Sequence, residues 1–234
     1  MQAGVGRPRL LLLRHGQGML GTDDYDRLSQ AGQRQSELMG ERVRAELGPG
    51  WLTWSGALRR HRQTLGRLNA PGVVFIDPAL NEYRVDELIR HAIEQAEFLG
   101  LVPPDAQAMA DPQAYLQTFL RWFPQVLEHW QSAQLNDPVN GSWALFRSRV
   151  LRSVRQWQAA LEGGHDVAVV TSAGVISTLV SELLGRPLTW QRELNVSLYN
   201  ASVTELRLTR SGRWQSGALN CVGHLEESSL HTLA

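Results

Sequence analysis

Residues 10–13 are all leucine, and they come directly before the triplet Arg14, His15 and Gly16. A short apolar run bounded by polar residues is typical of a strand buried on both faces of a parallel sheet. Open α/β sheets build their ligand sites at the carboxyl ends of such strands. A guanidinium can hold an oxyanion bidentately, a neutral imidazole is a competent nucleophile, and glycine allows a sharp turn. The triplet therefore fits an anion site, although alone it equally fits a salt-bridged arginine beside a surface histidine.

Strand and helix patterns alternate along the chain. Short apolar runs predict strands at residues 9–14, 52–55, 73–77, 166–171, 202–208 and 214–220. Helical periodicity predicts helices at residues 31–47, 58–69, 144–161 and 175–184. Such alternation indicates a three-layer α/β/α fold around a mostly parallel sheet. The Ser211-Gly212 pair favours a hairpin between the last two strands, and hence an antiparallel edge near the C-terminus.

The segment between Glu82 and Ser172 is too long for one crossover helix with its loops. Prolines divide it, so we expect one domain over residues 1–234 that carries a helical insertion at about 84–143. Aromatic residues in and beside this segment are expected to pack helices together rather than to form a substrate platform. They are Trp122, Phe123, Trp130 and Trp143.

The composition excludes several function classes. The net charge is zero, so we expect no nucleic-acid partner. All 23 basic residues are arginine, which carries no functional inference. Cys221 is the one cysteine, which excludes an internal disulfide. Histidines and carboxylates do not cluster at ligand spacing, so no metal is expected. Residues 1–9 lack the apolar core of a signal peptide, and no apolar run approaches about 18 residues. We therefore expect a cytoplasmic protein without a membrane partner, and the oligomeric state stays open.

Further motifs follow the Arg-His-Gly triplet in a fixed order. They are a helix start with Ser29 as a candidate N-cap, the run Ser55–Thr64, the segment Leu80–Tyr83 after a predicted strand, and the late run Asn200–Thr204. Together these motifs resemble the histidine phosphatase superfamily, also called phosphoglycerate mutase-like. The resemblance covers nearly the whole chain, and its specificity comes from the order of motifs that are each weak alone.

The resemblance implies a role for each motif. His15 would attack phosphorus and form a phosphohistidine, for which it must be neutral beforehand. Glu82 would protonate the leaving oxygen and then activate water, which requires a raised pKa. The implied phosphate-binding residues are Arg14, Arg60, Ser172 and Gln17. No cofactor is implied, and the expected partner is phosphate or a small phosphorylated substrate.

Three neighbours compete with Arg60 for the second arginine position. The family places this arginine two residues after a leucine and three before a Gln or Glu that precedes threonine, which selects Arg60. Arg59 and Arg62 point about 100° and 200° away around the helix, so we expect them on a solvated face. We apply the same objection to His61.

Ser172 departs from the family pattern, because the family's second histidine would stand at this position before Gly174. Serine can donate one hydrogen bond to a phosphoryl oxygen but cannot supply a positive charge. Loss of one such donor costs about 10²–10³ in rate. We expect a phosphomonoesterase; a phosphoglycerate mutase-type phosphotransfer and a catalytically degenerate protein that binds phosphorylated ligands stay open as alternatives.

Overall fold

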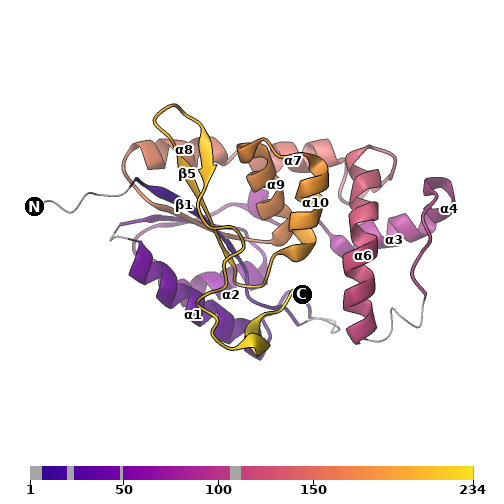
Figure 1. Cartoon of the computed structure of the whole chain (residues 1–234), viewed down its shortest axis with the longest axis horizontal. Helices are drawn as coiled ribbons and strands as arrows, with labels where there is room; N and C mark the ends of the chain where they lie inside the picture. Colours follow the sequence, from indigo (N-terminus) through magenta and orange to yellow (C-terminus); the bar gives the residue numbers. More distant parts are fainter. Residues whose placement is uncertain (1–6, 20–23, 48–49, 106–111, 234) are drawn as a thin grey trace, which may run out of the picture.

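The computed structural model describes residues 7–19, 24–47, 50–105 and 112–233. Within them one sheet of six strands has the order β3-β2-β4-β1-β5-β6. The strands are β1 (Arg9–Arg14), β2 (Leu52–Ser55), β3 (Val74–Ile76), β4 (Val167–Thr171), β5 (Val203–Leu208) and β6 (Trp214–Ser216). Strands β1 to β4 pair in parallel, whereas β5 and β6 pair antiparallel. This arrangement confirms the predicted α/β class with its antiparallel edge (Figure 1).

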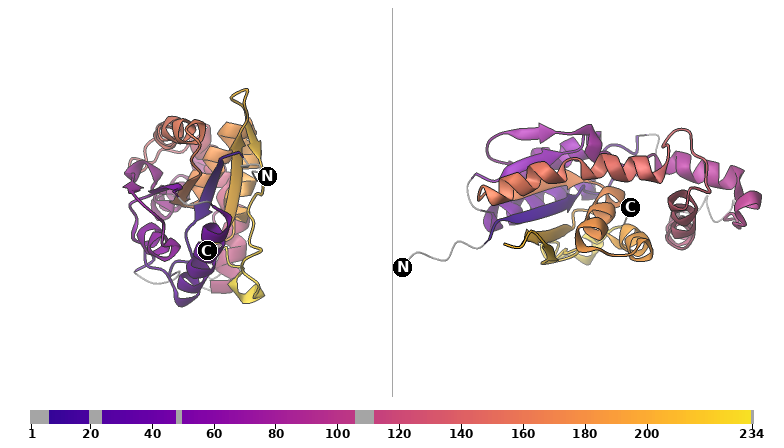
Figure 2. Two further views of the ribbon diagram at one scale, coloured as in Figure 1. Left: turned by 90° about the vertical axis from the view of Figure 1, so that its left-hand side faces the viewer. Right: turned by 90° about the horizontal axis from the view of Figure 1, so that it is seen from above.

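The leucine run divides its side chains between the two faces of the sheet, because successive residues of a strand point to opposite sides. Leu11 and Leu13 pack in a cluster with Met39 of α1 (Gln30–Glu46). Leu10 and Leu12 belong to the larger core on the other face. That core includes helices α8 (Val154–Glu162) and α9 (Ala173–Leu184). The two apolar clusters give the molecule its three layers (Figure 2).

Local signals placed some helices correctly and misplaced others. Ser29 caps α1 as predicted, since its hydroxyl accepts from the Gly32 N–H. The helix predicted over residues 144–161 is instead two helices, α7 (Trp143–Leu151) and α8. Between them the Ser153 hydroxyl donates to the Asp77 carboxylate, 2.5 Å away. Helix α10 (Leu188–Ser197) was not predicted.

The segment after β3 builds a helical wall beyond one end of the sheet (Figure 1). Its elements are η1 (Pro78–Leu80), α3 (Val85–Glu94), α4 (Ala96–Leu99) and α6 (Pro112–Gln131). The aromatic residues expected to pack helices are buried, which confirms that expectation; Trp130 and Trp143, for example, lie ring to ring at 5.2 Å. The helix α2 (Arg59–Leu68) lies beside α1, on the face of the sheet opposite to α8 and α9. The short helix η2 (Ser228–Leu230) lies near the C-terminus.

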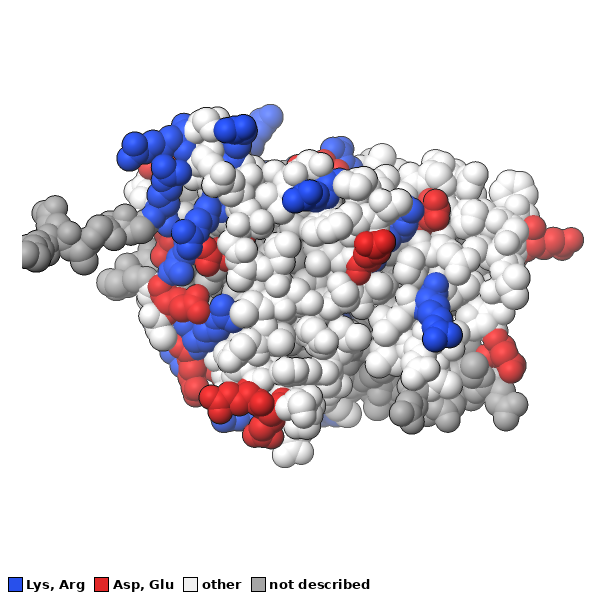
Figure 3. Space-filling model, viewed as in Figure 1, with Lys and Arg blue, Asp and Glu red and all other residues white. Residues whose placement is uncertain are grey.

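Charged side chains are distributed unevenly over the face drawn in Figure 3. Both signs gather at the end that carries the N-terminus, and the surface over α9 and α10 has few charges. Within the described part of the chain, no helix has the length and apolar character to cross a membrane.

Candidate functional site

The parallel strands bring the predicted site residues to one edge of the sheet. Arg14 ends β1 and His15 follows it, while Ser172 follows β4 directly. Arg60 stands in the first turn of α2, just after β2, and Glu82 follows β3 and η1. Because β1 to β4 run in the same direction, their carboxyl ends meet. Residues far apart in the sequence therefore form one cluster.

Hydrogen bonds define the protonation state of His15. Its Nδ1 lies 2.7 Å from the Gly16 carbonyl oxygen and must donate to it, so Nε2 carries the lone pair. Nε2 in turn accepts from Arg60 Nε at 3.2 Å. Burial and the charges of Arg60 and Arg14 hold the pKa of His15 well below its usual value. His15 is thus neutral, with a nucleophilic nitrogen facing a guanidinium.

The two arginines are buried and differently held. Arg14 donates to the Leu198 carbonyl, whereas its Nε is buried without a hydrogen-bond partner among the described residues. Arg60 pairs with Asp26 at 2.7 Å, and its guanidinium lies over the ring of Tyr25 at 5.3 Å from the centroid. A buried donor without a partner is costly, so Arg14 has capacity for an anion. Arg59 and Arg62 are exposed, as expected.

Glu82 is held by the start of α9. One carboxylate oxygen accepts from the Gly174 N–H at 2.8 Å, and the other from the Tyr83 N–H at 3.2 Å. Burial raises the pKa of Glu82, although the Gly174 hydrogen bond and the charge of Arg60 act in the opposite direction. A raised pKa suits a group that must give up a proton.

The segment that leads to Glu82 is held by a side chain of α7. The guanidinium of Arg149, on α7, donates to the carbonyl oxygens of Pro78 at 3.1 Å, Ala79 at 2.8 Å and Asn81 at 3.0 Å. One side chain therefore ties η1 and the residue after it to α7.

The expectation for His61 was wrong. This side chain is fully buried, and its Nε2 lies 2.6 Å from the hydroxyl of Ser172. Its ring centroid is 5.5 Å from that of His15. The angular argument fails for His61 because the buried face of α2 is wider than one residue, so that Arg60 and His61 are both buried although they lie about 100° apart around the helix. In the sequence, the position of His61 directly after Arg60 was the available sign that its imidazole lies near the site.

Gln17 lies beside the cluster and is engaged by other groups. Its side-chain carbonyl accepts from Ser29 at 2.8 Å, and its backbone N–H donates to Gln35 at 2.8 Å.

Asp26 and Tyr25, which hold Arg60, were not identified from the sequence. Their loop has no regular secondary structure, so periodicity gives no signal there.

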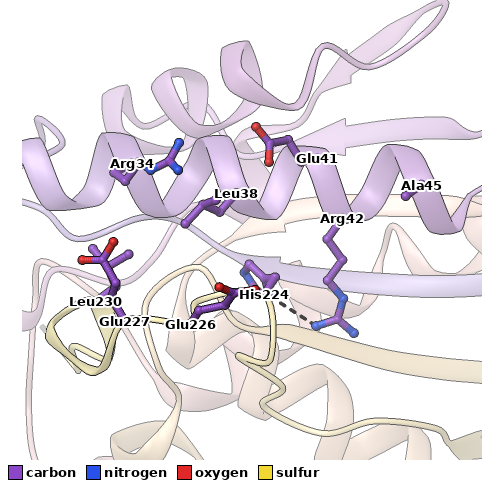
Figure 4. Close-up of a pocket in the computed structure, with 9 residues that line it drawn as sticks. All are labelled: Arg34, Leu38, Glu41, Arg42, Ala45, His224, Glu226, Glu227 and Leu230. Carbon is purple, nitrogen blue, oxygen red and sulfur yellow. Dashed lines mark hydrogen bonds between the residues drawn. The ribbon is translucent and has the colours of Figure 1, made fainter.

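A separate hollow of about 480 Å³ lies between α1 and the C-terminal segment (Figure 4). Its charged residues include both signs, and it contains none of the predicted site residues. Arg42 reaches across it toward His224 Nδ1 at 3.3 Å.

Among the described residues, no group of three or more His, Cys, Asp or Glu is placed to hold a metal ion.

Comparison with known proteins defines the class of this chain. A family model described as histidine phosphatase superfamily (branch 1) matches residues 106–222, half of the chain. The chain belongs to the histidine phosphatase superfamily. The matched half contains Ser172, whereas His15, Arg14, Arg60 and Glu82 precede it. No curated protein matches the sequence.

Solved structures share the fold over almost its whole length. The mycobacterial glucosyl-3-phosphoglycerate phosphatase in complex with VO3 is 24% identical with a TM-score of 0.62, covering 92% of this chain and 100% of that one. The same phosphatase with inorganic phosphate is 24% identical with a TM-score of 0.61, covering 93% and 99%. Bacillus stearothermophilus YhfR is 20% identical with a TM-score of 0.62, covering 94% and 100%.

Proposed function

We propose that this protein is a phosphomonoesterase that transfers a phosphoryl group from a small phosphorylated metabolite to His15 and then to water. The observation that carries the proposal is the neutral imidazole of His15, whose Nε2 lone pair faces the guanidinium of Arg60 at 3.2 Å. A nucleophile beside a buried cation suits attack on an anionic phosphate ester.

The proposed reaction has two steps. Phosphoryl oxygens bind Arg60 and the unpaired Nε of Arg14. The Nε–H of Arg60, which donates to His15 Nε2 before substrate binds, turns to a phosphoryl oxygen and frees the Nε2 lone pair. That lone pair forms the N–P bond while the P–O bond to the leaving group breaks, and Glu82 gives its proton to the departing oxygen. Water then attacks phosphorus and loses a proton to Glu82, and the N–P bond breaks to release inorganic phosphate.

Two alternatives remain in the same site. A phosphoglycerate mutase-type reaction must shield the phosphohistidine from water. A protein that only binds phosphorylated ligands needs neither a nucleophile nor a proton donor. The raised pKa of Glu82 beside a neutral His15 favours turnover over simple binding.

The test is a phosphatase assay over a panel of sugar phosphates, phosphoglycerates and nucleotides. His15→Ala should abolish release of phosphate, and wild-type protein should form an acid-labile phosphoenzyme. His165→Ala is the control, because His165 is exposed and precedes β4, at the opposite edge of the sheet. Full turnover by His15→Ala contradicts the proposal. Phosphate binding without turnover on the whole panel supports the binding protein instead.

A further inference from the structure

Ser172 stands at the N-cap of α9, yet its hydroxyl does not cap the helix. A serine at this position ordinarily accepts from the N–H two or three residues later. Within the described structure Ser172 makes no such bond, and the Gly174 N–H donates to Glu82 instead. Ser172 is buried, with 1% of its surface exposed, and its hydroxyl oxygen lies 2.6 Å from His61 Nε2.

His61 is buried beside His15, the proposed nucleophile. Its residue is 0% exposed, and a Cβ on Gly56 would come within 2.2 Å of its Nδ1. The glycine after β2 therefore gives the ring its space. Burial, helped by the charge of Arg60, holds the pKa of His61 well below its usual value, so the ring is neutral.

The contacts of the ring favour one tautomer. Nδ1 has no hydrogen-bond partner among the described residues. If Nδ1 carried the hydrogen, a buried N–H would lack an acceptor, which is rarer and costlier than a lone pair without a donor. The hydrogen therefore sits on Nε2 and is donated to the hydroxyl oxygen of Ser172. The hydrogen of Ser172 is then free to point away from His61.

We propose that His61 is a positioning residue that directs the hydroxyl of Ser172 at a phosphoryl oxygen, so that the two side chains together stand in for the second histidine of the family. This inference rests on the proposed function. Without His61 the hydroxyl is free to turn back and cap α9. With it the donor is oriented before the substrate arrives, which is the arrangement that stabilises a transition state without reorganisation.

A double-mutant cycle tests this relay, by which we mean the hydrogen bond from His61 to Ser172 together with the one from Ser172 to a phosphoryl oxygen. His61→Phe keeps an aromatic ring without a donor, and Ser172→Ala removes the hydroxyl. Each change should lower kcat by about 10²-fold, the scale of one oriented donor, with a smaller effect on KM. Because His61 acts through Ser172, the double variant should be no slower than Ser172→Ala alone. Multiplied losses, or unchanged kcat in folded His61→Phe, contradict the proposal.

His61→Gln is the conservative control, because its side-chain amide can place an N–H near the position of the imidazole Nε2. It should recover most of the activity that His61→Phe loses, whereas a purely space-filling role predicts the reverse order. Melting temperatures of all variants separate folding from positioning. A folded His61→Gln protein that is as slow as His61→Phe also contradicts the relay.

Two further readouts distinguish failure of the relay from failure of the proposed function. Calorimetric titration with inorganic phosphate should show weaker binding in His61→Phe than in wild type, and no such difference when Ser172 is already alanine. Nitrogen NMR of the wild type should show hydrogen on Nε2 of His61. If no substrate turns over but these results hold, the relay stands and the phosphatase proposal fails. Hydrogen on Nδ1 overturns the relay whatever the activity.

Discussion

The backbone N–H of Gly174 donates to the carboxylate of Glu82 at 2.8 Å, joining the start of α9 to a residue that follows η1. The first turn of a helix has unpaired N–H groups and a partial positive charge. The same contact lowers the pKa of Glu82, against the larger effect of burial. The position and the acidity of the proposed proton donor thus depend on one helix terminus.

Substitution of Gly174 should disturb this contact. An added Cβ would come within 2.4 Å of both Glu82 Oε1 and Tyr83 Cε1, so Gly174→Ala should lower kcat and destabilise the fold by about 1–3 kcal/mol. Gly66→Ala is the control, because Gly66 lies within α2 and nothing lies within 4 Å of its added Cβ. That change should stabilise the protein by about 0.5–1 kcal/mol. Chemical denaturation and steady-state rates measure both, and equal effects at the two sites would contradict the close contact.

Removal of the proton donor should matter most for poor leaving groups. Glu82→Gln keeps the size of the side chain but cannot transfer a proton. With alkyl phosphates kcat/KM, which reports formation of the phosphoenzyme, should fall about 10²–10⁴-fold, whereas with p-nitrophenyl phosphate, whose leaving group needs no protonation, the loss in kcat/KM should be much smaller. Parallel assays of both substrates measure the difference. Equal losses would show that Glu82 does not act as the acid.

The choice between neighbouring arginines can be checked by phosphate binding. Arg60 is buried against His15 and Asp26, whereas Arg59 is exposed and pairs with Asp24 at 3.0 Å. Arg60→Ala should weaken binding of inorganic phosphate at least 10-fold, because it removes a charge-assisted donor. Arg59→Ala should change it little. Calorimetric titration of both variants decides the assignment, and the opposite ranking would overturn it.

Restoring a histidine at position 172 is expected from the sequence to raise turnover, provided that the site has room for a second imidazole. The structure shows that His61 occupies that room, with its Nε2 2.6 Å from Ser172 Oγ. Ser172→His alone should therefore lower the melting temperature and the activity through overpacking. Combined with His61→Ala, it should recover stability and raise kcat above that of His61→Ala. Melting curves and rates for the three variants test this, and a stable, active single variant would contradict it.

Acid should weaken the fold through its buried histidines. Burial holds the pKa values of His15 and His61 well below the usual value in the folded state, so below about pH 6.5 the unfolded chain binds more protons. The free energy of unfolding should consequently decrease as the pH falls from about 6.5, by up to about 1.4 kcal/mol per pH unit for each histidine. His61→Phe should show a shallower decrease, whereas Ser172→Ala keeps the imidazole and should retain the slope. Denaturation at several pH values measures it; identical slopes for wild type and His61→Phe would contradict the assignment.

Several features of the fold were predictable because local chemistry decides them. The leucine run fixes β1 at Arg9–Arg14, and Ser29 caps α1 as its residue type suggests. The break between α7 and α8 was not predicted; the residue at the break, Ser153, contacts Asp77, which is distant in the sequence. Arg60 was selected through the family resemblance, and in the structure it contacts His15. His61 was misassigned because the width of the buried face of α2, which takes in two consecutive residues, depends on tertiary packing and not on local sequence.

Arg149 ties the backbone before Glu82, the proposed proton donor, to α7 through the carbonyl oxygens of Pro78, Ala79 and Asn81. A substitution that shifts α7 is therefore expected to shift the backbone that leads to Glu82. The position of the proposed proton donor thus depends on a helix that contributes none of the proposed catalytic residues.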